Sequence, residues 1–408
     1  MLLQRISLDR NFLASTFVNA KSGFDMATAH IRIVWRAGEN LESVKAEMKM
    51  KWRALIFCAV AALAAGCSHI GYFVQAAQGQ LTLLSEAQPI DDWLARTDIT
   101  DKLRTKLTQV KEIRAFAAKE LALPDNGTFT TYADLKRPFV MWNVVATSEL
   151  SLKPVQWCFP VAGCVNYRGY YSKEDAQSYA AELRAAHYDV EVSGVPAYST
   201  LGWFRDPVLS TFIQYPEGEL ARLVFHELAH QVVYVPGDSS FNESFAVTVE
   251  EAGVERWLSM YGSDKMRASY AEYEGRKQDF LALLLKHRKR LEEVYKRNIS
   301  DAEKRKEKAA IFQSIKDEYQ ALKASWGGYS GYDRWFAEPL SNAHLAAIAT
   351  YHDFVPGFRA LLAQQKRFDK FYQAVKMLAG LDKDERHRRL AAFAGPPAIA
   401  DNASAASR

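Results

Sequence analysis

The chain has 408 residues, with 52 Lys and Arg against 48 Asp and Glu and a formal net charge of +4. Residues 1–66 hold nine basic and five acidic residues, so the rest of the chain has 43 of each and no net charge. This balance gives no electrostatic basis for binding nucleic acid, and residues 67–408 are numerous enough for one large domain or two lobes.

The N-terminal segment has the features of an export signal. Lys49, Lys51 and Arg53 precede an apolar run, residues 54–66, which ends at Cys67. A run of thirteen residues is short for spanning a bilayer, but it suits the apolar part of a signal peptide with a basic flank. Residues 1–47 have no role in such a signal, so translation is expected to start at Met48 or Met50.

The end of this apolar run, Ala-Ala-Gly-Cys at residues 64–67, resembles a lipobox, the site at which bacterial lipoproteins are cleaved and lipidated. On this interpretation Cys67 becomes the lipid-modified first residue. The protein is then anchored to a bacterial membrane from the periplasmic side, and Ser68 favours the outer membrane. The alternatives are cleavage after Ala64, which would release a soluble exported protein, and an uncleaved anchor.

Four cysteines are present, and two of them belong to this N-terminal signal. Cys58 lies in the apolar run and Cys67 is the expected site of the lipid. Cys158 and Cys164 remain, and in an exported protein they are expected to form a disulfide that closes a tight loop. The alternative is that the two cysteines bind a metal ion, but such a site would need further ligands that are not nearby in the sequence.

Residues 80–200 mix helices with short β-rich segments. Apolar residues spaced at three or four predict helical structure over residues 80–123, and an amphipathic helix is expected near 173–187. The β-rich segments are Phe139–Val145, Val155–Phe159 and Tyr188–Val195, the last of which alternates as a strand does.

The segment with the clearest chemistry is His226-Glu227-Leu228-Ala229-His230, inside a helix predicted over Glu219–Tyr234. Two histidines four residues apart lie on the same helix face, as a shared metal ion requires. Glu227 sits beside that face, where it can take a proton from a bound water molecule. This is the H-E-x-x-H pattern of zinc hydrolases. The alternative is a pair of hydrogen-bonded histidines without a metal.

A catalytic zinc ion takes three protein ligands and leaves one position for water. Glu243 is the predicted third ligand, at the start of a second helix that runs to about Tyr261. The alternative role for Glu243 is a capping box with Ser240, which would only satisfy the helix start. Glu250 is a rival ligand on nearly the same helix face, but we expect it to hydrogen-bond a ligand and fix its orientation.

These two segments together resemble the gluzincin metallopeptidases. His226-Glu-Leu-Ala-His-Gln231, followed by Asn242-Glu-Ser-Phe-Ala246 and Glu250, is similar to the pattern of the zinc aminopeptidases, H-E-x-x-H-Q then N-E-G-F-A-x-x-x-E. With the lipoprotein-like start, the chain resembles the bacterial "predicted aminopeptidase" family from about residue 67 to 390. The resemblance implies a zinc cofactor, a peptide substrate and, in Pro196–Phe204, an edge strand that binds the substrate backbone. A core strand and loop is the alternative for that segment.

Two features depart from the aminopeptidase pattern. Twelve residues separate His230 from Glu243, a tighter connection than in those aminopeptidases or in thermolysin. The G-x-M-E-N segment with which the aminopeptidases hold a free amine is also missing. The resemblance therefore supports hydrolysis of peptide bonds better than it supports exopeptidase action.

The implied mechanism assigns Glu227 as the general base, which takes a proton from water and delivers it to the leaving amine. The oxyanion also needs a hydrogen-bond donor opposite the metal. We favour Tyr332, because it lies in a Gly-rich, aromatic segment suited to a loop near a cleft. The other candidates are Tyr329, Tyr351, His344 and His352.

The predicted fold class is α+β, a predominantly helical zincin-like metallopeptidase with a small β-sheet beside the active-site helix. Residues 1–66 form the leader, residues 67–394 the peptidase domain and residues 395–408 a disordered tail. Within the domain, residues 265–325 form a charged helical arm whose helices break near Asn298–Asp301. Two rival functions remain: a non-catalytic zinc-binding envelope lipoprotein that acts as a binding or assembly module, and a zinc amidase that acts on cell-wall fragments.

Overall fold

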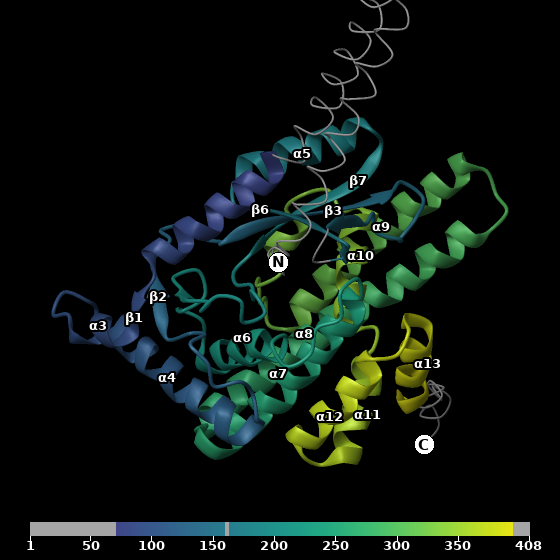
Figure 1. The fold of residues 1–408 in the computed structure, drawn as a ribbon. Coiled ribbons are helices and arrows are strands. Elements are labelled where there is room, and N and C mark those ends of the chain that lie inside the picture. The colour runs from purple at the N-terminus through teal and green to yellow at the C-terminus, as the bar shows by residue number, and fades with distance from the viewer. Residues whose placement is uncertain (1–70, 160–162, 395–408) are drawn as a thin grey trace, which may run out of the picture. The chain divides into compact units, whose positions relative to one another are not determined.

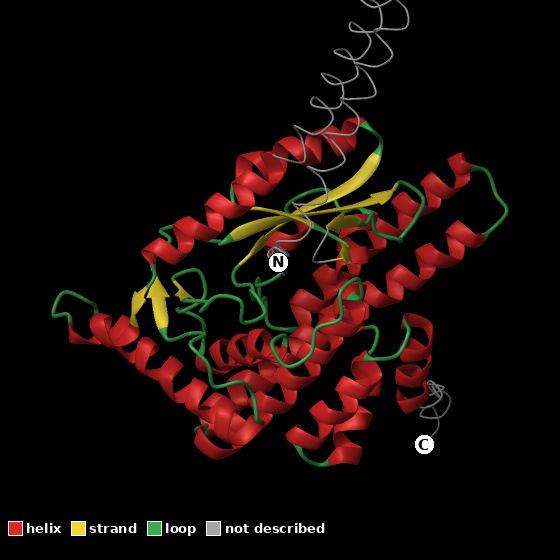
Figure 2. Ribbon diagram, in the orientation of Figure 1, coloured by secondary structure: helices red, strands yellow, loops and turns green. Residues whose placement is uncertain are grey.

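The computed structural model of residues 1–408 describes residues 71–159 and 163–394 (Figure 1). The leader with Cys58 and Cys67, and the C-terminal tail, lie outside the described residues. The described part is mostly helical with small sheets (Figure 2), which confirms the α+β prediction. Across residues 71–159 and 163–394, no helix combines the length and the apolar character needed to cross a bilayer.

The sheet that matters for the site has three antiparallel strands in the order β6, β3, β7. The central strand β3 (Met141–Ser148) pairs with β6 (Arg168–Tyr170) on one side and with β7 (Tyr188–Val195) on the other. The strand β7 has the bounds that its alternating sequence predicts, because period-2 patterning marks a strand between two different layers. Its pairing places Ser193 opposite Asn143 and Glu191 opposite Val145.

Helices cover both faces of this sheet (Figure 1). Helix α5 (Lys173–Ala185) packs on one face, where Ala176 and Ala180 are fully buried. Helix α10 (Asn342–His352) packs across β3 and β7 on the other face. The sheet thus has a helix on each face, and the face covered by α10 borders the site described below.

The remaining strands are short. A second sheet contains β1 (Gln88–Pro89), β2 (Thr131–Ala133) and β8 (Val208–Leu209). The hairpin of β4 (Trp157–Phe159) and β5 (Gly163–Val165) places Cys158 opposite Cys164. These two cysteines, the pair that the sequence predicts, form a disulfide with an S–S distance of 1.96 Å.

The core is built around α6 (Glu217–Ala229) and α7 (Ser239–Tyr261). Phe225 of α6 and Phe241 and Phe245 of α7 are each 0% exposed, and burying such a side chain is worth about 2–3 kcal/mol. The helices α4 (Asp101–Leu121) and α11 (Val355–Gln365) pack around this pair. The α6–α7 pair is therefore fixed by the main hydrophobic core.

Helix α6 is shorter than the sequence predicts, and this changes the position of His230. The helix ends at Ala229, and His230 is its C-terminal cap. The backbone N–H groups of Gln231 and Val232 bond carbonyl oxygens three residues back, which tightens the chain into a turn. The predicted end at Tyr234 is wrong, although Pro236, which a helix cannot continue through, was the correct kind of signal.

The start of α7 removes the alternative role considered for Glu243. Asp238, not Ser240, caps the helix, and its side chain accepts a hydrogen bond from the Phe241 N–H. Glu243 is therefore free of the capping role that Ser240 would have given it. Asp238 is itself held by Arg386, with Nη2 and Oδ2 2.7 Å apart. Arg386 belongs to α13 (Lys383–Ala394), so this buried ion pair fixes the first turn of α7.

The predicted arm is a pair of long helices, α8 (Asp264–Lys296) and α9 (Asp301–Ser325). They break where the sequence indicates, and Ser300 forms a capping box with Glu303. The two helices share a separate hydrophobic cluster, and Lys308 of α9 pairs with Asp189 of β7 at 2.6 Å. The shorter helices are α3 (Ile90–Ala95), η1 (Asp333–Phe336) and α12 (Phe368–Ala379).

Glu191 on β7 makes the stability of the fold depend on pH. Burial, reinforced by the nearby charge of Glu338, raises the pKa of Glu191 from 4.5 to about 8. The folded state therefore holds this proton more tightly than the unfolded chain does. That stabilisation is complete below pH 4.5 and is lost as the pH rises through about 8.

We expect the free energy of unfolding to fall by about 3–5 kcal/mol between pH 5 and pH 9 through this group. Urea unfolding at several pH values measures how steeply the free energy of unfolding falls with pH, and Glu191→Gln should remove most of this slope. Glu182→Gln, at an exposed position of α5, is the control and should leave the slope unchanged. An equal slope in the Glu191 variant and the wild type would contradict this assignment.

Candidate metal centre

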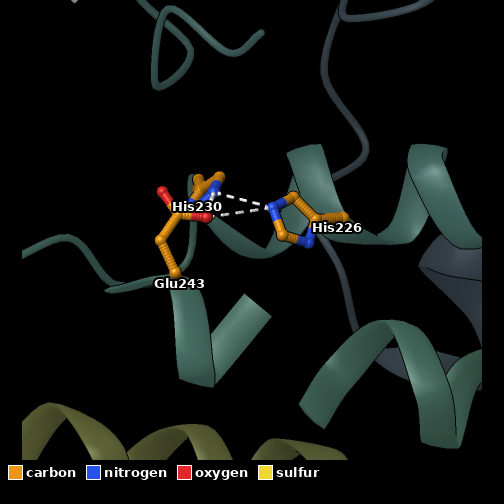
Figure 3. Close-up of side chains that lie close together, drawn as sticks. All are labelled: His226, His230 and Glu243. Atoms are coloured by element: carbon orange, nitrogen blue, oxygen red, sulfur yellow. Dashed lines mark hydrogen bonds and ion pairs between the residues drawn. The ribbon is translucent and has the colours of Figure 1, made fainter. Parts of the chain in front are cut away.

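The two motif histidines and Glu243 point toward one another (Figure 3). His226 lies in the last turn of α6 and His230 caps its end, so one helical turn separates them. Glu243 comes from the first turns of α7. The turn between the two helices is short, and this brings the start of α7 back to the end of α6.

The three ligand atoms have the spacing of a tetrahedral zinc site. His226 Nε2 lies 3.2 Å from His230 Nε2 and 3.3 Å from Glu243 Oε2. His230 Nε2 lies 3.6 Å from the same oxygen. Donors bound to zinc at about 2.05 Å in tetrahedral geometry lie about 3.4 Å apart. The residues therefore fit a zinc ion without rearrangement.

Glu250 orients His226 rather than competing for the metal position. Its Oε2 accepts a hydrogen bond from His226 Nδ1 at 2.7 Å, so Nε2 is the ring nitrogen that faces Glu243. Arg222 Nη1 donates to the other carboxylate oxygen of Glu250 at 2.9 Å. This is the arrangement that the sequence predicts for Glu250, because a ligating histidine needs its second nitrogen held.

Arg222 and Lys277 were missed by the sequence analysis. Arg222 lies one helical turn before His226 and also bonds Glu219 at 3.0 Å, while Lys277 of α8 lies 3.8 Å from Glu250. The i, i+4 spacing of Arg222 and His226 on α6 was a usable signal, since both face the same side of the helix. The contribution of Lys277 depends on tertiary packing and had no local signal.

The charges of the site favour a bound cation. Burial lowers the pKa of His226, but the carboxylates of Glu243 and Glu250 outweigh it and raise this pKa to about 10. Burial raises the pKa of Glu243, but the two histidines outweigh it and lower this pKa to about 2. Two carboxylates thus share one protonated imidazole, whose proton a metal ion would displace on binding.

Glu227 is buried beside the ligands, with 8% of its surface exposed. Burial raises its pKa, while the charges of His226 and His230 oppose the shift. A carboxyl group with a raised pKa is a better proton acceptor than an ordinary one at the same pH. The charges of His226, His230, Glu243 and Glu250 all act on Glu227, so its carboxyl group lies close to the candidate ligands.

Tyr332, the favoured oxyanion donor, lies in an aromatic cluster of the arm. Its ring stacks on Phe280 with centroids 4.0 Å apart, and it packs near Trp326 and Tyr329. Within the described residues no contact joins Tyr332 to His226, His230 or Glu243. The Gly-rich segment folds against α8, and the charges of Glu219 and Arg222 act on the Tyr332 phenol. The role of Tyr332 as an oxyanion donor stays a prediction.

Tyr351, an alternative from the sequence, is close to the ligands. Tyr351 is 39% exposed; the negative charge of Glu243, with partial desolvation, raises the pKa of its phenol well above the ordinary value, so the phenol stays protonated. Of the other candidates, Tyr329 stacks under Arg276 and His344 bonds Ser341. His352 lies near the site, where burial and the charge of Lys277 lower its pKa to about 4 while the charge of Glu250 opposes the shift.

Glu243 and Tyr351 line one wall of a cavity of about 70 Å³, which we call the Asn143 pocket. Its opposite wall is the sheet, with Asn143 and Val145 from β3 and Ser193 from β7. Ala346 of α10 lies beside Tyr351 in the same lining. The pocket therefore opens between the sheet and the helix that carries the third ligand.

The segment Pro196–Phe204, predicted as an edge strand, forms a loop in the structure. The strand β7 ends at Val195, and Asp206 accepts hydrogen bonds from the Thr200 N–H and hydroxyl at 2.8 and 2.7 Å. Leu201 and Gly202 both have positive φ angles, which breaks the extended conformation. The strand that precedes this loop is nevertheless an edge strand, because β7 stands at the end of the order β6, β3, β7. Its binding of a substrate backbone stays a prediction.

A comparison with protein families bears on this site. A family model described as "Putative aminopeptidase" matches residues 71–390. The chain belongs to this family. No curated protein and no solved structure matches the chain. Family membership supports peptidase activity and a peptide substrate, and it spans the α6–α7 pair, the sheet and the arm.

The ligand set predicts how metal binding responds to substitution. Glu243→Gln should abolish stoichiometric zinc binding, because it removes the charged ligand. Glu250→Gln should keep the zinc but weaken its affinity by about 10–100-fold. Metal analysis and competition with a chelator measure both effects, and Glu255→Gln, at an exposed position of α7, is the control. Undiminished zinc in the Glu243 variant, with zinc lost from the Glu250 variant, would reverse the two roles.

Proposed function

We propose that the protein is a zinc-dependent peptidase of the aminopeptidase type. The observation that carries the proposal is the spacing of 3.2–3.6 Å among His226 Nε2, His230 Nε2 and Glu243 Oε2. A structural zinc site has four protein ligands, whereas three ligands leave a position for water. Glu227 beside such a site supports hydrolysis, since a purely structural metal has no use for a buried base.

Each residue of the site has a distinct role in this proposal. A zinc ion bound here lowers the pKa of water toward 7 and polarises a peptide carbonyl. Glu227 takes the proton of the attacking water and passes it to the leaving amine. Glu250, held by Arg222, keeps the His226 ring in place through the reaction.

Tyr351 replaces Tyr332 as the proposed donor to the developing oxyanion. It lines the same pocket as Glu243, and its phenol keeps its proton beside three carboxylates. A protonated phenol next to the reacting carbonyl can donate the hydrogen bond that the oxyanion requires.

We also propose that the protein is a lipoprotein, anchored through Cys67 to the periplasmic side of the outer membrane. The support is the basic flank, the thirteen-residue apolar run and the lipobox-like residues 64–67. The Cys158–Cys164 disulfide agrees with export, because disulfides persist in oxidising compartments.

The base is tested by Glu227→Gln. We expect hydrolysis to fall by at least about 100-fold, with zinc content unchanged, because the amide cannot accept the proton. The assay uses a panel of free-amine peptides, amine-blocked peptides and cell-wall muropeptides. Turnover of blocked peptides would remove the aminopeptidase label, and turnover of muropeptides alone would make the protein an amidase. Wild-type activity in the variant would exclude Glu227 as the base.

The two tyrosines are tested as a matched pair. Tyr351→Phe should lower kcat by about 100-fold or more with little change in KM, since it removes a donor used in the transition state. Tyr332→Phe should keep kcat within about twofold, because its ring still stacks on Phe280. Steady-state kinetics on one peptide substrate decide between them. A loss confined to the Tyr332 variant would restore the interpretation made from sequence.

A further inference from the structure

The Asn143 pocket contains a hydrogen-bonding group that the fold leaves unused. Within the described residues, Asn143 Oδ1 is buried and has no hydrogen-bond partner. An unsatisfied buried carbonyl of this kind is costly, and proteins normally pair it with another group. The neighbouring Asn166 differs, because its Oδ1 accepts a hydrogen bond from Gln156 Nε2 at 3.2 Å. Asn143 alone therefore marks a place for an absent donor.

The position of Asn143 is fixed by the sheet. It lies in the middle of β3, paired with Ser193 on one side and Gly169 on the other. The strand pairing fixes the face of the sheet from which Asn143 projects, and its side chain lines the pocket with that of Ser193.

The size of the pocket limits what can enter. About 70 Å³ is available, and a single water molecule needs roughly 10–15 Å³ by the same measure. The pocket therefore holds about five or six water-sized groups. This matches a side chain of four or five heavy atoms and is small for the ring of tryptophan.

The charge of the pocket narrows the choice further. Among the described residues that line it, Glu243 carries the only charge, and Glu243 is the third metal ligand. Glu191, the next residue on this face of β7, is neutral at pH 7 because burial raises its pKa to about 8. Because Glu243 is bound to zinc in the proposed site, a lysine side chain there would face a net positive centre and no free carboxylate. An ionised aspartate or glutamate side chain has no hydrogen to donate to Asn143 Oδ1.

We propose that the Asn143 pocket binds the carboxamide side chain of a glutamine or asparagine next to the scissile bond. Two carboxamides pair through two hydrogen bonds, because each has a donor and an acceptor. The pocket shares Glu243 and Tyr351 with the reaction centre, so the side chain it holds belongs to a residue beside the cleaved bond. This inference rests on the proposed peptidase function and names its substrate class.

The test compares peptides that carry Gln, Met, Lys or Glu at the residue on either side of the scissile bond in turn. Methionine matches glutamine in length and lacks the amide. We expect kcat/KM for the Gln peptide to exceed that for the Met peptide by about 10–100-fold in the wild type. Asn143→Leu, which is close in size, should reduce this ratio to about twofold or less, while zinc content stays unchanged.

Three results would overturn the proposal: equal rates for Gln and Met peptides, a preference for Lys or Glu peptides, or an undiminished Gln preference in Asn143→Leu. The wild-type comparison decides the matter even if that variant does not fold. Calorimetry with Gln-Ala and Met-Ala dipeptides on the Glu227→Gln protein separates binding from turnover. Should the wild type hydrolyse nothing, tighter Gln-Ala binding would still support the pocket, and equal binding would exclude it.

Discussion

The contact on which the site depends is the hydrogen bond between His226 Nδ1 and Glu250, 2.7 Å long. It fixes the ring of His226, and so it decides which nitrogen faces the metal position. Glu250 lies on α7, the helix that also supplies Glu243. Helix α7 therefore provides both the candidate ligand Glu243 and the carboxylate that holds His226. The geometry of the site thus depends on how α6 and α7 cross.

The crossing is held at the turn between the two helices. Helix α6 ends at Ala229 and α7 begins at Ser239. A connection this short restricts the angle at which the two helices can cross. Asp238 caps α7 while Arg386 and His387 hold its carboxylate from α13. Removing one partner of a buried ion pair is strongly destabilising. The C-terminal helix thus contributes to the site without contacting it.

Local patterns predicted the parts of the fold that are local. The alternation in Tyr188–Val195 marked β7 to the residue. Spacing and capping residues also predicted the motif helix, the break in the arm and the grouping of His226, His230 and Glu243. The predicted end of α6 was too late, because the chain tightens at Gln231 and Val232 through backbone hydrogen bonds. The side chains of these residues give no signal for such a turn.

The features that depend on tertiary packing could not be predicted. Tyr351 and Asn143 meet in one pocket only because α10 packs across β3, and nothing in either segment indicates that contact. Tyr332 has the better local context, a Gly-rich aromatic loop, yet Phe280 of the arm captures its ring. With nineteen tyrosines in the chain, composition could not separate these two residues.

The central claim is that two imidazoles and one carboxylate from adjacent helices bind zinc and leave one position for water. X-ray absorption at the zinc edge of the zinc-loaded protein tests it most directly. The account predicts four nitrogen or oxygen neighbours at about 2.0–2.1 Å, with the scattering of two imidazole rings. A sulfur neighbour near 2.3 Å, a single imidazole, or no zinc in the purified protein would contradict it.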